Sequence, residues 1–135
     1  DEFSRLADGH SRLKGFAGHT PTVHEWIRDN VQTDFQMCSY YNPTDRTASP
    51  HHISHGESWV PEHRDKMAAV ITTINVPVVH YKVFAGGNMP IHEAFQFMGR
   101  TVRPGDIALF GIYPGDDPDQ LVADIELFER FVERG

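Results

Sequence analysis

Apolar residues along this chain alternate between two kinds of spacing. Short segments rich in apolar and aromatic residues are separated by segments in which apolar residues recur every three or four positions. The first kind predicts strands at residues 12–19, 34–42, 77–85 and 106–113. The second predicts helices around residues 23–31, 62–75, 91–102 and 122–132. Residues 1–11 resemble the end of an earlier helix followed by a turn.

The βαβαβαβα order predicts an α/β fold with a parallel sheet and right-handed crossovers. The 135 residues fit a single domain. Two architectures remain open: a small sheet with helices on its faces, or half of a (βα)₈ TIM barrel, whose usual length is ~250 residues. The third and fourth strands are apolar in both alternating positions, so we expect both of their faces to be covered.

One connection is much longer than the others. About 19 residues separate Asn42 from Pro61, against the ~2–6 that are usual after a strand. Loops that follow the strands carry the functional face in both architectures. This connection is therefore a candidate lid or substrate loop.

Charge and composition exclude several classes of partner. The net charge is −7 and no basic stripe runs along any segment, which argues against nucleic acid and against an anionic membrane surface. No apolar run reaches the ~18 residues of a membrane span. The only cysteine, Cys38, allows no intrachain disulfide, so we expect a reducing, cytoplasmic location. Because the chain begins at Asp1, we expect a processed product or a fragment of a longer chain.

The third predicted strand carries the sharpest chemical candidates. His80 and Lys82 lie two residues apart and should share one face, with Tyr81 on the other. An ionised lysine is costly to bury among helices without a partner. We therefore expect His80 and Lys82 to point into a barrel as candidate catalytic residues, and Val79, Tyr81 and Val83 to point outward. The alternative for Lys82 is an internal ion pair.

Other candidates lie at predicted strand ends. Gly86 and Gly87 precede a helix and suit either an anion site or a plain turn. Substrate-rim candidates are Tyr40, Tyr41 and Asn42, and Tyr113 ends the last strand. Weak metal candidates are His51, His52 and His55, whose spacing matches no strong zinc signature. Core positions at helical spacing are Trp26, Met67, Phe95 and Phe128.

The strand motifs "RLKGFAGHT", "DFQMCSYYN", "PVVHYKVFAGG" and "DIALFGIYPGDDPDQLVADIELF" together resemble the second half of the aldo/keto reductase family. That family is a (βα)₈ barrel, and these would be its strands five to eight. The resemblance implies the C-terminal half-barrel of an NAD(P)-dependent oxidoreductase, in which Tyr81 stacks on nicotinamide. It also places His19, Gly86, Gly87 and Tyr113 around the cofactor.

The chain departs from the family at two places. The family's catalytic Asp-Tyr-Lys-His set belongs to the first half of the barrel, which this chain lacks. Gly18-His19 falls where the family has Ser-Asn, and Asp116, Asp117 and Asp119 stand where it offers Lys or Arg to a 2′-phosphate. Carboxylates at a helix start already take the role of an anion there and would repel a phosphate.

A half-barrel cannot close alone, because its outer strands are bare edges. We expect either a missing N-terminal half-barrel or a homodimer, with a small molecule as substrate. The rival enzyme class is a Schiff-base lyase, because "KVFAGG" resembles the lysine strand of deoxyribose-phosphate-type aldolases. The non-enzyme alternative is an inactive fragment or a diverged, non-catalytic barrel protein.

Overall fold

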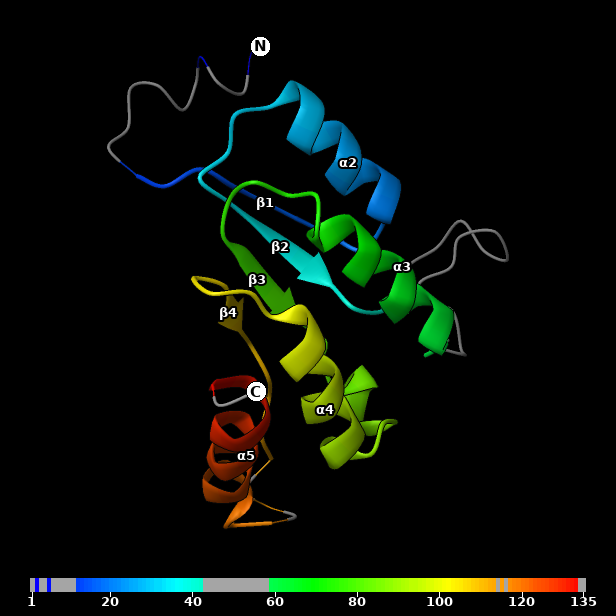
Figure 1. The fold of residues 1–135 in the computed structure, drawn as a ribbon, viewed down its shortest axis with the longest axis vertical. Helices are drawn as coiled ribbons and strands as arrows, with labels where there is room; N and C mark the ends of the chain where they lie inside the picture. The colour runs from blue at the N-terminus through cyan, green and yellow to red at the C-terminus, as the bar shows by residue number, and fades with distance from the viewer. Residues whose placement is uncertain are drawn as a thin grey trace.

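A four-stranded parallel sheet in the order β1-β2-β3-β4 forms the centre of the computed structural model (Figure 1), which describes residues 2, 5, 12–42, 59–113, 115 and 117–133. The strands are β1 (Gly15–Gly18), β2 (Phe35–Ser39), β3 (Val78–Tyr81) and β4 (Ile107–Ala108). The predicted α/β class and parallel pairing are confirmed. Every strand is shorter than its predicted segment, and β4 has only two residues.

Helices follow the strands as the apolar spacing predicts. They are α2 (Pro21–Asn30), α3 (Pro61–Ile71), α4 (Ile91–Thr101) and α5 (Gln120–Phe128), which continues into the π-helical turn η2 (Glu129–Glu133). Proline occupies the first turn of α2 and of α3, where its missing N–H costs no hydrogen bond. The helix end expected in residues 1–11 lies almost wholly outside the described residues.

Helices α2, α3 and α4 lie along one side of the sheet (Figure 1). Strands that follow one another in sequence order through right-handed crossovers place their helices on the same face. On that face Gln36, Cys38, Val78 and His80 are at most 1% exposed. On the opposite face Ile107 is 57% exposed. The expectation that both faces of the third and fourth strands are covered is therefore wrong for the described part of the chain.

The core lies between the sheet and its helices. Its fully buried apolar side chains include Met67 and Ile71 of α3 and Phe95 and Met98 of α4. Met67 and Phe95 are thus confirmed as core residues, and Phe128 packs partly buried against the same cluster. The prediction for Trp26 is wrong, because α2 turns His24 and Ile27 towards the sheet and leaves Trp26 57% exposed.

Arg103 fastens the start of β4 to the end of α3. Its guanidinium donates hydrogen bonds to the carbonyl oxygens of Ile71, Ile74 and Val76 at 2.9, 2.5 and 3.0 Å. It also donates to the carboxylate of Asp106 at 2.8 Å. Ile71 ends α3, and Ile74 and Val76 follow it in the connection to β3, so this one side chain satisfies carbonyls that the helix itself does not pair.

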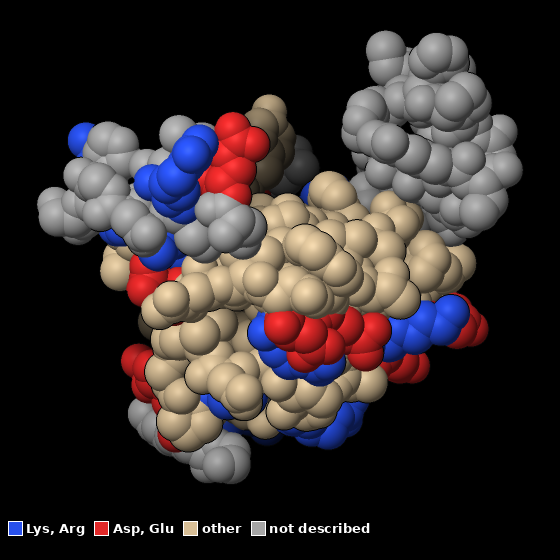
Figure 2. Space-filling model, turned by 90° about the horizontal axis from the view of Figure 1, so that it is seen from above, with Lys and Arg blue, Asp and Glu red and all other residues tan. Residues whose placement is uncertain are grey.

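Charged side chains on the face seen in Figure 2 are of both signs and lie next to one another. Between them this face is largely uncharged, and no single-sign patch stands out on it. Among the described residues, the helices are too short or too polar for any of them to cross a bilayer.

Candidate functional site

The end of β3 turns sharply into a left-handed segment. Strand β3 stops at Tyr81, four residues before the predicted end, because Lys82 has a φ of 56°. Ala85, Gly86 and Gly87 also have positive φ and form the 3₁₀ turn η1 (Ala85–Gly87). Left-handed backbone breaks the alternation of side chains along a strand. As a result, Tyr81 and its neighbour Lys82 both line one pocket.

The direction predicted for His80 is wrong. The imidazole points under the helices and is completely buried, while Tyr81 lies on the uncovered face of the sheet. His80 Nε2 lies 3.1 Å from a carboxylate oxygen of Asp106, and Nδ1 lies 3.1 Å from the hydroxyl of Tyr40. A carboxylate only accepts, so Nε2 carries the proton and Nδ1 accepts from Tyr40. An imidazole with both nitrogens paired can be buried at little cost.

Burial sets the charge states in this cluster. Loss of solvent lowers the pKa of His80 below its usual value, although the hydrogen bond from His80 to Asp106 opposes this. Burial alone raises the pKa of Asp106, but hydrogen bonds from Arg103, from the Val78 N–H and from His80 more than offset it and hold that pKa at about 2. A neutral imidazole is thus fixed between a tyrosine and a carboxylate. His80 does not line the pocket.

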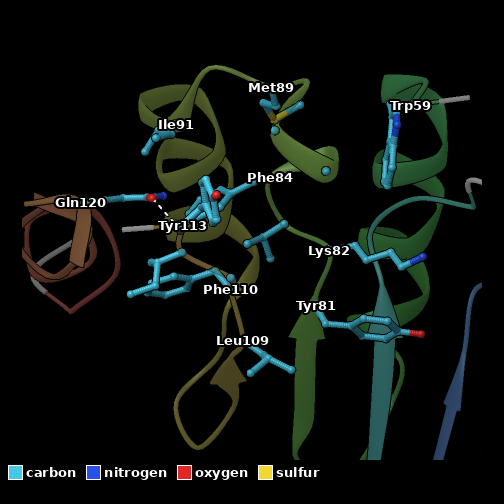
Figure 3. Close-up of a pocket in the computed structure, with 15 residues that line it drawn as sticks. Trp59, Tyr81, Lys82, Phe84, Met89, Ile91, Leu109, Phe110, Tyr113 and Gln120 are labelled. Carbon is cyan, nitrogen blue, oxygen red and sulfur yellow. Dashed lines mark hydrogen bonds between the residues drawn. The ribbon is translucent and has the colours of Figure 1, made fainter. Parts of the chain in front are cut away.

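A pocket of about 720 Å³ opens at the carboxyl ends of β3 and β4 (Figure 3). Ligand sites of parallel α/β proteins lie at these strand ends. Five of the fifteen lining residues are aromatic: Trp59, Tyr81, Phe84, Phe110 and Tyr113. Among the described residues, Lys82 is the only charged side chain in the lining.

Lys82 extends between Trp59 and Tyr81 in the view of Figure 3. Its Nζ lies 5.9 Å from the centre of the Trp59 ring, within range of a cation–π attraction. The described residues offer Lys82 neither a carboxylate nor a hydrogen-bond acceptor. Within that part of the chain, the internal ion pair considered for Lys82 is not formed, and its side chain lines the pocket.

Tyr81 is held by the end of β1. Its hydroxyl donates a hydrogen bond to the carbonyl oxygen of Gly18 at 3.2 Å, and its ring centre lies 5.9 Å from that of His19. Burial raises the pKa of Tyr81, so the hydroxyl stays protonated as a donor. The structure thus brings His19 beside Tyr81. Gly86, Gly87 and Tyr113 line the pocket together with Tyr81, and His19 does not.

Two of the predicted rim residues are not at the rim. Tyr40 and Tyr41 are at most 1% exposed. Tyr40 packs against His80 beneath the helices, and its pKa is raised by burial. The Tyr41 ring lies 5.7 Å from that of Trp59 and so supports the pocket wall from behind. Asn42 is half-buried and donates its backbone N–H to the imidazole of His63 at 3.4 Å.

Sequence reasoning missed the aromatic wall of the pocket. Trp59 follows the long connection, and the sequence predicts no role for it. Gly86, which lies close to Trp59 in space, is a signal that a bulky side chain is near. A Cβ added at Gly86 would lie 2.8 Å from the Trp59 ring, and Gly86 has a φ of 62°. Phe84 and Phe110 belong to predicted strands but lie beyond the observed ones, where their tilted rings are in contact with centres 5.4 Å apart.

The metal candidates His51, His52 and His55 lie outside the described residues. Within the residues that are described, no three side chains of His, Cys, Asp or Glu come together as metal ligands. Cys38 is completely buried, and burial raises its pKa to about 12, so it is present as a neutral thiol.

The two ends of a dinucleotide cofactor are not equally accommodated. Tyr81 offers a partly exposed aromatic face at the pocket, which suits a flat nicotinamide ring. At the start of α5, however, the carboxylate of Asp117 already accepts the N–H of Asp119 at 3.0 Å. A phosphate placed there would meet that negative charge. The described residues fit a nicotinamide but not an extra phosphate at α5.

The fold and pocket define an α/β protein with a four-stranded parallel sheet and an aromatic cavity at its strand ends. Comparisons of the chain with protein-family models, with curated proteins and with solved structures found no match.

Proposed function

We propose that the chain forms the C-terminal half of a (βα)₈ barrel and supplies the substrate and cofactor face of an oxidoreductase resembling the aldo/keto reductases. The sequential strand order and the helices along one side of the sheet support a half-barrel. The uncovered face, with Tyr81 and Ile107, then corresponds to the barrel interior.

The placement of Tyr81 carries this proposal. The reductase resemblance requires this side chain to face the barrel interior, and it does lie on the uncovered face, at the strand end, in the pocket. Its ring is fixed by the bond to Gly18 and by His19, and can therefore receive a flat ring without reorganising. Bound NADH would supply the hydride, and Lys82 would hold an anionic or polarised oxygen of the substrate.

Calorimetric titration of the complete protein with NADH and NADPH tests the reductase proposal. We expect NADH to bind, and NADPH to bind more weakly because of Asp117. The variant Tyr81→Ala should weaken NADH binding about 5-fold by removing the stacking surface, whereas Tyr81→Phe should change it less than about 2-fold. Absence of binding by either dinucleotide would contradict the proposal.

Lys82 favours a second candidate function, a Schiff-base lyase. It is the only charged side chain in the described lining of the pocket, where its amino group is accessible to a carbonyl compound. The Nζ lone pair would attack the carbonyl carbon, and loss of water would leave an imine. Borohydride with a small aldehyde should then add mass to Lys82, with Lys66 of α3 as the internal control; an unmodified Lys82 excludes the lyase.

The uncovered sheet face requires a partner in either case. We propose that a second half-barrel, on a separate polypeptide or in another copy of this chain, closes it. Light scattering of the isolated chain separates the two alternatives. A dimer would indicate that a second copy of this chain closes the barrel, and a monomer that the other half lies on a separate polypeptide. If neither dinucleotide binding nor lysine trapping occurs in the closed assembly, a non-catalytic barrel protein remains. The buried thiol of Cys38 is consistent with a cytoplasmic location.

A further inference from the structure

We infer that the pocket at the ends of β3 and β4 selects an aromatic 2-oxo acid, a compound with a flat ring, a carbonyl group and a carboxylate. The inference rests on the proposed carbonyl chemistry and names its substrate class. It is carried by the distribution of aromatic, charged and already paired groups around the pocket.

The walls of the pocket favour a ring. Trp59 and Tyr81 stand on one side of it and Phe84 and Tyr113 on the other (Figure 3). Aromatic surfaces bind a flat ring by stacked or edge-on contact in addition to the gain from burial. Trp59 and Phe84 are themselves braced from behind, Trp59 by Tyr41 and Phe84 by Phe95 at a ring separation of 5.5 Å. The ring site is therefore formed before a ligand arrives.

The polar groups of the lining favour one negative charge. The side-chain oxygen of Gln120 already accepts the Tyr113 N–H at 3.0 Å, and its nitrogen lies 3.4 Å from the carboxylate of Asp124. The Tyr81 hydroxyl is committed to Gly18. Lys82 thus remains as a donor with three N–H groups and no described acceptor. One ammonium can hold a carboxylate and the adjacent carbonyl oxygen of a 2-oxo acid together.

The size of the pocket agrees with such a ligand. Small-molecule sites range from roughly 300 to 1,000 Å³, and this pocket measures about 720 Å³. A single ring joined to a three-carbon acid fits within that volume. A ligand with a second negative charge would find no second cation in the described lining.

Three probes separate the contributions of ring and charge. Phenylpyruvate carries both, pyruvate carries only the charged end, and phenylacetaldehyde carries the ring and a carbonyl without the charge. Calorimetry on the complete protein, without a dinucleotide, should show phenylpyruvate binding at least about 10-fold more tightly than either of the others. In Lys82→Met the preference for phenylpyruvate over phenylacetaldehyde should fall below about 2-fold. Lys66 is an exposed residue of α3, so the control Lys66→Met should keep the preference for phenylpyruvate over phenylacetaldehyde.

Each outcome bears on the inference separately from the reductase proposal. Equal binding of pyruvate and phenylpyruvate, or a preference that survives Lys82→Met, overturns the aromatic 2-oxo acid. If phenylpyruvate binds as expected while NADH does not, the substrate class stands and the reductase fails. If NADH binds and none of the three probes does, the substrate class fails and the reductase stands.

Discussion

The imidazole of His80 and the carboxylate of Asp106 form a buried pair 3.1 Å apart, with side chains that are 0% and 2% exposed. They join β3 to the residue just before β4. Arg103 donates to the same carboxylate and to the carbonyl of Ile71, the last residue of α3. The short strand β4 is therefore secured by polar contacts at its start more than by its own ladder.

This pair should make the protein sensitive to acid. Asp106 has a pKa of about 2 in the folded protein against 3.8 when unperturbed. Its folded-state pKa is depressed, so its stabilising contribution is present above about pH 4 and is lost as the pH falls towards 2. The difference corresponds to about 2 kcal/mol of unfolding free energy. Urea unfolding of Asp106→Asn between pH 6 and 3 should show a shallower decline than the natural protein.

The matched control for that experiment is Asp65→Asn on α3, whose side chain is 65% exposed. It should keep the steep decline between pH 4 and 3. Equal slopes for the natural protein and Asp106→Asn would mean that other carboxylates dominate acid unfolding.

The two glycines of η1 differ in what surrounds them. A Cβ at Gly86 would lie 2.8 Å from the Trp59 ring, whereas one at Gly87 would have no atom within 4 Å. Both have positive φ, so alanine at either should cost about 1 kcal/mol of stability. Gly86→Ala should cost about 1 kcal/mol more and displace Trp59. Fluorescence in a Trp26→Phe background, where Trp59 is the only reporter, would show the displacement; identical spectra for the two variants would refute it.

Cys38 should be inert in the folded protein. Its side chain is completely buried, and burial raises its pKa to about 12, so almost no thiolate is present at neutral pH. We expect an aromatic disulfide reagent to label it fully in urea and only at the rate of unfolding in buffer. Rapid labelling of the native protein would show that the sheet under α2 opens independently of the core.

Phe95 links the core to the pocket. It is completely buried in α4, and its ring makes edge-on contacts with Phe84 and Phe110, which both line the pocket. Phe95→Ala should lower the unfolding free energy by about 3–5 kcal/mol through the cavity it leaves. Gln96 is the exposed neighbour of Phe95 in α4, so Gln96→Ala serves as the control and should change stability by less than about 0.5 kcal/mol. Chemical denaturation measures both, and a small loss in Phe95→Ala would mean that the core refills.

The sequence predicts the order and type of these elements well, because apolar spacing reports directly on which side of a helix or strand is buried. It does not predict where β3 ends. Lysine rarely adopts a left-handed conformation, so nothing in the local pattern marks the turn at Lys82. Alternation alone extends the strand through Lys82 and places its side chain on the face of His80.

The prediction of where the His80 side chain points is wrong for a different reason. Its partner Asp106 lies 26 residues further along the chain, and only the pairing of β3 with β4 brings the two together. A histidine inside an apolar strand therefore looked like a functional group. Similarly, Trp26 fits the helical spacing of a core residue, yet α2 is rotated so that His24 meets Gln36 at 2.7 Å instead.

Lys82 should be held in a strained conformation that the pocket requires. A left-handed residue other than glycine costs about 1–2 kcal/mol, and strain of this kind tends to occur at functional sites. Glycine at this position removes the strain but adds about 0.5–1 kcal/mol of backbone entropy loss, so Lys82→Gly should leave stability unchanged or raise it by up to about 1.5 kcal/mol. Phenylpyruvate binding should be lost in the same variant.

Lys66→Gly provides the contrast, because Lys66 is exposed within α3 and glycine in a helix costs about 1 kcal/mol. In urea denaturation, Lys82→Gly should be at least as stable as the natural protein and Lys66→Gly less stable. In calorimetry, Lys66→Gly should bind phenylpyruvate and Lys82→Gly should not. If Lys82→Gly unfolds as readily as Lys66→Gly, the left-handed backbone is not strained, and Lys82 is placed in the pocket without a cost to stability.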